Sequence, residues 1–249
     1  MTLRSTTAFV LRVDPISEKD VAVSFLTPDL GVVRGVVAGG RGKGRKGALL
    51  QLLTEVSVTF FVREGRDLAR ADSLEMKASA FALATRAETA MLLPYLAESL
   101  STFLPEADAA PETYRLVRHV LDALGEGVPA DLAARYFEVW LLLLAGLLAD
   151  PGTCAGCGRA LAGEAVRLDP EEGAFVGPEC GGRGGLPLSP ATLALLARLR
   201  RSPLGALAAA RVAEPDDLRA LETLAREIRR RFLGHELKSY RFLEALGPA

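Results

Sequence analysis

The stretch from Thr54 to Arg63 reads T-E-V-S-V-T-F-F-V-R, and its apolar and polar side chains alternate. Alternation with period two is typical of a β-strand that buries one face and exposes the other. Adjacent residues of a strand point to opposite faces, so one of Phe60 and Phe61 has to face a core. At most one of the two phenylalanines is therefore available to stack on a ligand.

Similar short runs lie on both sides of this strand, at 7–13, 21–27, 31–38 and 68–74. Between two of them, Thr27 to Gly31 (T-P-D-L-G) has Pro and Gly at positions suited to a turn, which predicts a hairpin over 21–38. Five short antiparallel strands predict a small barrel over residues 1–77. The OB-fold is the commonest nucleic-acid-binding barrel of this kind, and an SH3-like barrel has the same pattern.

A glycine-rich basic segment, Gly39 to Gly47, follows the third predicted strand with five glycines, four cations and no apolar side chain. Its part 42–47 matches G-x-G-x-x-G, but no βαβ pattern surrounds it, and no Gly-Lys is followed by Ser or Thr as in a Walker A loop. It is either a solvated loop or a flexible cationic loop that reaches phosphates. The candidate phosphate contacts here and on the neighbouring strands are Arg34, Arg41, Lys43, Arg45, Lys46, Arg63, Arg66 and Arg70.

Beyond Met76 the apolar period changes to 3.6, which predicts a helical domain over residues 78–150. Pro111 and Pro129 fall at positions suited to helix starts. After the cysteine-containing segment, Ser189-Pro190 predicts a helix that ends at Arg200 or Arg201. Pro215, with acidic residues directly after it, predicts a last long helix over about 215–246.

Arginines cluster on the two closing helices. In the last helix, Glu222 precedes Arg226 by four residues and Glu227 precedes Arg231 by four, an order that favours pairing on the helix surface. This pattern leaves Arg229 and Arg230 freer to contact a polyanion, although an ordinary charged face would look the same. A second cluster without evident partners consists of Arg198, Arg200 and Arg201.

The segment 151–187 carries all three cysteines of the chain. Cys154-x-x-Cys157, then twenty-two residues, then Cys180-x-x-Arg183 has the frame of a two-knuckle zinc site whose last ligand is replaced. Two readings stay open. Three thiolates could bind Zn²⁺ with water or a borrowed carboxylate from Glu171, Glu172 or Glu179. Alternatively, Arg183 could take the place of the metal's charge in a metal-free knuckle.

The net charge of −1 hides an uneven distribution. Residues 1–80 carry +3, residues 81–150 carry −6, residues 151–187 carry −2 and residues 188–249 carry +4. This layout predicts that polyanions bind at the two basic ends. The odd cysteine number and the C-x-x-C argue against a disulfide framework, and no signal segment or membrane-spanning run is evident, so we expect a cytoplasmic protein.

Residues that support catalysis are few. The two histidines, His119 and His235, lie far apart and match neither H-E-x-x-H nor the zinc deaminase signature. No serine sits in a recognisable nucleophile motif. The sequence therefore indicates a binding protein that is not an enzyme and uses no nucleotide.

Short matches in a fixed order give a resemblance over nearly the whole chain. They are Glu18-Lys19-Asp20, Thr27 with Gly31, Ala38 before the basic loop, Tyr95 with Glu98, Phe137-Glu138, Leu141, Gly146, Pro151, Cys154-x-x-Cys157-Gly158 and Leu237-Lys238-Ser239-x-x-Phe242-Leu243. In these residues the chain resembles the RecO family of bacterial DNA-repair proteins. The fourth cysteine of that family is Arg183 here.

The resemblance implies an α+β protein: an N-terminal five-stranded OB-fold barrel (1–77), then an all-helical domain (78–150) with an inserted zinc-knuckle-like segment (151–187), completed by C-terminal helices (188–249). It implies a recombination mediator that binds single- and double-stranded DNA, anneals strands coated by single-strand-binding protein, and acts with RecR to load RecA. Such a protein works on the nucleoid. An RNA-binding barrel with a zinc ribbon and a protein-interaction scaffold are the alternative functions.

Overall fold

The computed structural model describes residues 2–42, 44–62, 68–169, 171–180, 184–241 and 243, without the side chains of Thr2, Arg45 and Val62. The chain divides into two compact units. The first contains residues 1–118 together with the segment that begins at Leu237, and the second contains residues 119–236. No helix in the described part of the chain is both long enough and apolar enough to span a bilayer.

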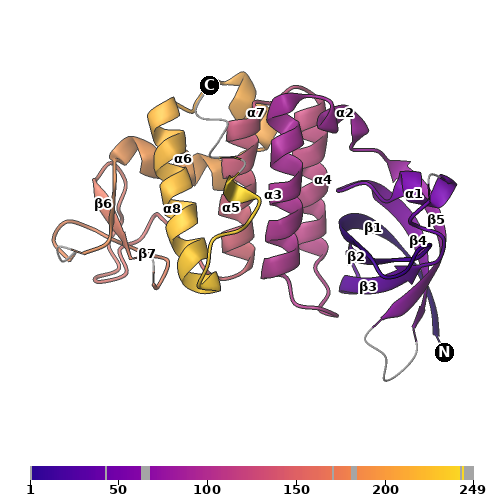
Figure 1. Cartoon of the computed structure of the whole chain (residues 1–249). Coiled ribbons are helices and arrows are strands. Elements are labelled where there is room, and N and C mark those ends of the chain that lie inside the picture. Colours follow the sequence, from indigo (N-terminus) through magenta and orange to yellow (C-terminus); the bar gives the residue numbers. More distant parts are fainter. Residues whose placement is uncertain are drawn as a thin grey trace. The chain divides into compact units, whose positions relative to one another are not determined.

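Five strands of the first unit close into a barrel in the order β1-β2-β3-β5-β4 (Figure 1). Their bounds are β1 Thr2–Pro15, β2 Val21–Thr27, β3 Gly31–Val37, β4 Glu55–Val62 and β5 Ala69–Ala78. This is the OB-fold, and the predicted five-stranded barrel is confirmed. One detail was wrong, because β3 and β5 pair in parallel and only the other pairs are antiparallel.

The barrel interior is filled by the apolar residues that alternate along the strands. Phe60 is fully buried and packs edge-on against Phe25, with ring centroids 5.5 Å apart. Phe61, one residue later, is half-buried on the outer side of β4. The prediction that one phenylalanine faces the core is confirmed.

The glycine-rich segment contains a short helix, α1 (Arg45–Leu49), which the prediction of an irregular loop missed. Leu49 and Leu50 at its end belong to the barrel core, which anchors this end of the segment. Burial of two leucines therefore offsets the cost that glycines impose on ordering the backbone.

The turn between β2 and β3 depends on Thr27 and Gly31. The Thr27 hydroxyl donates to the Gly31 carbonyl at 3.0 Å and accepts from the Leu30 N–H at 3.0 Å. Gly31 has φ +64°, and a Cβ on it would lie 1.9 Å from the backbone oxygen of Asp108. The segment after α3 thus packs directly on this turn, where the Ala107 N–H donates to the Val32 carbonyl at 3.2 Å.

Three helices follow the barrel: α2 (Phe81–Ala84), α3 (Ala87–Phe103) and α4 (Pro111–Gly125), which starts at the predicted proline. A buried carboxylate joins the barrel to α4. Glu55 of β4 accepts hydrogen bonds from the Tyr114 hydroxyl at 2.8 Å and from the Arg118 guanidinium. Burial, together with the carboxylate of Glu55, raises the pKa of Tyr114 to about 12.

The segment that begins at Leu237 returns to α3 in the first unit. Glu98 of α3 accepts hydrogen bonds from the backbone N–H groups of Lys238 and Ser239, at 3.1 and 2.7 Å, and from the Ser239 hydroxyl. Tyr95, one turn earlier, contacts Tyr240 with ring centroids 5.9 Å apart. Partial burial raises the pKa of Glu98, but the hydrogen bonds from Ser239 and Lys238 outweigh it and hold the pKa below its usual value.

This contact predicts a pH-dependent stability that Glu98→Gln removes. The folded-state pKa lies below the unfolded value near 4.5, so the stabilisation is present above that pH and is lost as pH falls through the folded pKa. At neutral pH we expect Glu98→Gln to lower the free energy of unfolding by about 1 kcal/mol, because a partly exposed carboxylate accepts these bonds. Urea titrations should show this gap closing as the solution is acidified.

Glu126→Gln, at an exposed position after α4, is the control for loss of one carboxylate. Its free energy of unfolding should equal that of the wild type at every pH. If the difference in free energy of unfolding between the wild type and Glu98→Gln stays constant as the pH falls, this role of Glu98 is contradicted.

The second unit contains α5 (Ala130–Leu144), α6 (Pro190–Arg201), α7 (Leu204–Ala209), α8 (Pro215–Leu233) and a small sheet with the strand order β7-β6-β8. The strands are β6 Val166–Asp169, β7 Ala174–Val176 and β8 Leu186–Leu188. Ser189 caps α6 by accepting the Thr192 N–H at 3.0 Å, as Ser189-Pro190 predicted. The expected helix 215–246 was too long, because Gly234 takes the left-handed conformation (φ +73°) and ends α8 at Leu233.

Candidate nucleic-acid surface and cysteine cluster

Arginines lie in a row across the outer face of the barrel. Arg12 of β1 is paired with Ser24 of β2, and Ser24 is paired with Arg34 of β3. Gly35 faces the interior, where a Cβ would lie 3.4 Å from the ring of Phe60, so Arg34 on its neighbouring position faces outward. Both arginines are exposed, and they lie two strands apart on one surface.

A second row continues around the barrel. Val36 of β3 is paired with Arg70 of β5, Arg70 with Phe61 of β4, and Phe61 with Leu3 of β1. Arg70 has a side chain that is 70% exposed, and Leu3 is 58% exposed. An aromatic ring is thus flanked by an arginine on one strand and an apolar side chain on the other. We call Arg12, Arg34, Arg70 and Phe61 together the barrel face.

The cations of the barrel face differ in how strongly they are neutralised. Arg12 forms an ion pair with Asp14 at 2.8 Å, and Arg70 approaches Asp72 at 3.7 Å. Arg34 forms no ion pair with any residue that the structure describes. All of these side chains are well exposed, so their ion pairs are weak and a phosphate can compete for them.

The predicted basic loop is described only in part. The Arg41 guanidinium donates to the Ser17 carbonyl at 2.9 Å, which fixes it over the β1–β2 turn, and Lys46 is half-buried. Lys43, Arg63 and Arg66 lie outside the described residues, as does the side chain of Arg45. The phosphate contacts expected of these four residues therefore remain predictions.

The arginines of the closing helices are less available than the sequence indicated. Arg229 is only 3% exposed and pairs with Glu236 at 2.9 Å and with Glu138 at 3.6 Å, so the expectation that it is free for DNA is wrong. Arg200 pairs with Asp150, which corrects its place in an unpaired cluster.

Two arginines of α8 that were expected to pair within the helix also form longer-range ion pairs. Arg226 pairs with Glu236 at 2.9 Å, and Arg231 pairs with Glu171 at 2.6 Å. The exposed arginines that remain of the predicted set are Arg198, Arg201 and Arg230.

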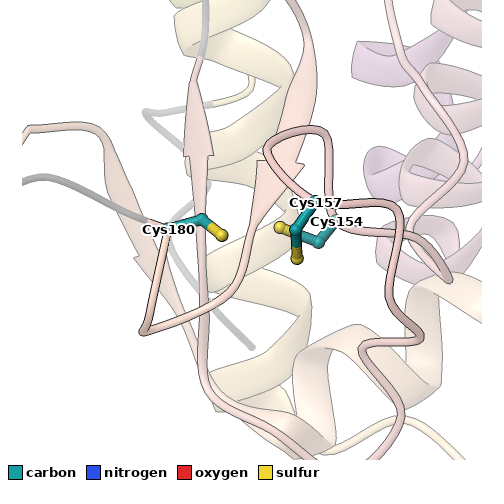
Figure 2. Close-up of side chains that lie close together, drawn as sticks. All are labelled: Cys154, Cys157 and Cys180. Atoms are coloured by element: carbon teal, nitrogen blue, oxygen red, sulfur yellow. The ribbon is translucent and has the colours of Figure 1, made fainter.

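The three cysteines come together as their spacing predicted. Their sulfur atoms all lie within 4.8 Å of one another. Figure 2 shows Cys154 and Cys157 on one loop and Cys180 on a second loop, with the sulfurs directed toward each other. Cys154 is buried, whereas Cys157 and Cys180 are exposed. The two loops are in close contact, because a Cβ on Gly156 of the first loop would lie 2.8 Å from the Cβ of Cys180 on the second.

Three thiolates at this separation suit a zinc ion, which takes sulfur ligands at about 2.3 Å in a tetrahedron. Among the described residues, no carboxylate or histidine joins the cluster as a fourth donor. Glu171 pairs with Arg231, Glu179 lies near Arg159 at 3.9 Å, and Glu172 does not join the cluster either. None of the three carboxylates that the sequence offered as a fourth ligand is therefore supplied. Arg183, at the fourth position, lies outside the described residues.

Backbone groups tune the buried thiol. The Gly177 N–H donates to the Cys154 sulfur at 3.4 Å and, with the N–H groups of Cys157 and Gly156, lowers the pKa of Cys154 to about 6. Hydrogen bonding with the Cys157 thiol, desolvation and the charge on the neighbouring sulfurs raise the pKa of Cys180 to about 11. The cluster therefore carries a thiolate at Cys154 near neutral pH.

The cysteine segment is fastened to the helices of its own unit. Gly173, with φ +61°, lies so close to the turn after α5 that a Cβ on it would be 1.9 Å from the Leu147 backbone oxygen. The Ala149 N–H donates to the Gly173 carbonyl at 2.8 Å, and Arg231 of α8 holds Glu171. The segment thus holds its place through contacts that do not involve the cysteines.

Comparison with known proteins identifies the family to which both parts of the chain belong. Residues 1–80 match the family model described as Recombination protein O N terminal, and residues 85–241 match Recombination protein O C terminal. The chain belongs to the RecO family. A "DNA repair protein RecO" of Anaeromyxobacter sp. (strain K) is 33% identical over 97% of this chain and 96% of its own length. The one of Geobacter metallireducens is 29% identical over 98% of both chains.

Several residues behind the RecO resemblance have a visible structural role. Thr27 and Gly31 shape the β2–β3 turn, and Glu98 holds Ser239. By contrast, no sequence pattern indicated Arg12 of the barrel face. Arg12 lies in one row with Arg34 because the register of β1 against β2 shifts between Val10 and Arg12. This shift is visible only in the strand pairing.

Proposed function

We propose that this RecO-family protein is a non-enzymatic recombination mediator. It binds single- and double-stranded DNA, anneals complementary strands, and with RecR helps to load RecA onto DNA coated by single-strand-binding protein. It acts in the cytoplasm, on the nucleoid. The observation that carries the proposal is the match of both halves of the chain to the RecO family, on an OB-fold whose outer face bears arginines.

The barrel face supports contact with DNA in two ways. Arg34, Arg12 and Arg70 offer guanidinium groups to backbone phosphates, a contact that is independent of sequence. Phe61 offers a ring on which a base can stack, and bases are available for stacking only where the strand is single. Phosphate contacts therefore serve both forms of DNA, whereas the ring favours single strands.

In the proposal, other cations also contact phosphates. On the barrel these are Arg41 and Lys46, with Lys43, Arg45, Arg63 and Arg66 of the regions that are not described; on the second unit they are Arg198, Arg201 and Arg230. The buried Arg229 and the paired Arg200 are left out, because each is held by acidic partners. Weak sequence preference and strong salt dependence follow from a surface of this kind.

The roles of the two histidines support a function without bond chemistry. The His119 Nε2 accepts the Leu204 N–H at 3.2 Å, and the His235 Nδ1 lies 3.0 Å from the Leu233 carbonyl. Both rings are thus engaged by backbone groups. A zinc ion at Cys154, Cys157 and Cys180 would cross-link two loops of the small sheet, a structural task rather than a catalytic one.

Strand annealing tests the proposal. Complementary oligonucleotides coated with single-strand-binding protein should anneal faster when this protein is added, with no nucleotide present. Competition between single-stranded DNA and RNA of equal length should favour DNA. If RNA competes better, the protein is instead an RNA-binding barrel.

A further inference from the structure

The three thiols of the cysteine cluster are close enough to react with one another. All sulfur pairs lie within 4.8 Å, and two of the thiols, Cys157 and Cys180, are exposed. A disulfide requires the sulfurs at about 2.0 Å and the Cβ atoms at about 3.5–4.5 Å. Rotation about the Cα–Cβ bond of an exposed cysteine can move its sulfur far enough to close the remaining distance to the other sulfur.

The backbone, rather than a choice of rotamer, brings the two exposed thiols together. A Cβ on Gly156 would lie 2.8 Å from the Cβ and 3.3 Å from the sulfur of Cys180, and Cys157 is the next residue in the chain. The loop is fixed by hydrogen bonds of 2.8 Å from the Ala155 N–H to the Phe175 carbonyl and from the Gly158 N–H to the Cys154 carbonyl. Cys180 therefore faces this loop whichever rotamer it takes.

We propose that Cys157 and Cys180 form a modification site, at which a hydroperoxide oxidises the two thiols to an intrachain disulfide. One thiol releases its proton, and the thiolate attacks the terminal peroxide oxygen. The O–O bond breaks and the departing oxygen takes up a proton, so that a sulfenic acid and one molecule of water or alcohol result. The second thiol then attacks the sulfenic sulfur, the S–S bond forms, and water leaves. Two electrons pass from the two sulfurs to the peroxide.

Cys154 has a different part in this chemistry. It is buried, and its sulfur accepts the Gly177 N–H, so it is protected from the oxidant. Three cysteines yield one disulfide and leave one thiol, that of the buried Cys154. The disulfide also removes two of the three sulfur donors, so oxidation and metal binding exclude each other. This proposal is independent of DNA binding.

The test uses the full chain, reduced, treated with a chelator and then exposed to hydrogen peroxide. Free thiols should fall from three to one per chain, and the protein should stay monomeric on a non-reducing gel. Peptide mapping should find Cys157 joined to Cys180, and dithiothreitol should restore all three thiols. Cys154→Ser should still form the same cross-link.

Three results would overturn the proposal. These are three unchanged thiols after peroxide, a cross-link between Cys154 and Cys157, or addition of oxygen to single cysteines without any cross-link. Because mapping is done on the wild-type protein, the outcome does not depend on a variant that folds.

Discussion

Replacing Arg34 and Arg70 together by glutamate is expected to weaken the binding of single-stranded DNA by on the order of 100-fold at low salt. Each reversal removes one phosphate contact and adds a repulsive charge, an effect of about tenfold per residue. The slope of log affinity against log salt should become shallower by about 1.4, since each phosphate contact on a single strand contributes about 0.7. Fluorescence anisotropy across a salt series measures both quantities.

The matched control for each single reversal, Arg34→Glu or Arg70→Glu, is Arg219→Glu, on α8 in the second unit. Arg219 is exposed to a similar degree and lies beside Asp216 as Arg70 lies beside Asp72, so one reversal there changes the net charge comparably at a site outside the proposed surface. It should leave the affinity and the salt slope close to those of the wild type. Equal losses in the control and in Arg34→Glu would point to overall charge and would contradict a defined barrel face.

Phe61 separates stacking from charge on the same surface. Phe61→Ala should weaken the binding of single-stranded DNA by about fivefold to 150-fold, because base stacking contributes about 1–3 kcal/mol, and should leave the affinity for duplex DNA unchanged. Phe61 is half-buried on the outer side of β4, so its removal leaves the barrel core intact.

Gly31→Ala is expected to destabilise the first unit by about 4 kcal/mol or to prevent folding. The glycine has φ +64°, which costs other residues about 1 kcal/mol, and a new Cβ would lie 1.9 Å from the Asp108 oxygen and 2.7 Å from its carbon. Both atoms belong to the backbone, so relief requires that the segment after α3 move off the β2–β3 turn. Thermal and urea unfolding monitored by circular dichroism measures the loss.

Gly39→Ala isolates the cost of the backbone conformation. Gly39 has a similar φ of +71°, but a Cβ there would meet nothing within 4 Å. The Gly39→Ala variant should lose only about 1 kcal/mol of its free energy of unfolding. Similar losses for the two variants would show that the approach of Asp108 to Gly31 is not tight in solution.

The barrel could be predicted from the sequence because each strand carries its own signal. Alternation at Thr54 to Arg63 predicted that one of Phe60 and Phe61 faces the core, and the structure shows that it is Phe60. The parallel pairing of β3 with β5 could not be read in this way, because strand order is set by how the sheet closes and leaves no local pattern. For the same reason the row of Arg12 and Arg34 was missed.

Arg229 is buried for two reasons. It lies on the buried face of α8, where it pairs with Glu138 of α5 at 3.6 Å. Gly234 ends α8 in the left-handed conformation and turns the chain, so that Glu236 reaches both Arg226 and Arg229. The predicted DNA contact is therefore part of a buried ion-pair network.

The cysteine cluster shows how far spacing alone can predict a site. The C-x-x-C and Cys180 were correctly expected to meet, because two short turns can present their sulfurs to one point. The absence of a carboxylate among the described neighbours was not predictable, since Glu171 is drawn to Arg231, sixty residues away in sequence.

The central claim is that the barrel face makes this protein a DNA-annealing mediator. The rate at which coated complementary strands form a duplex tests it most directly. Complementary strands saturated with single-strand-binding protein are mixed, and duplex formation is followed by fluorescence quenching without nucleotide. The account predicts that the wild-type protein accelerates annealing and that the variant with Arg34→Glu and Arg70→Glu does not, although it folds normally. It is contradicted if the wild type leaves the rate unchanged, or if the folded variant accelerates annealing as well as the wild type.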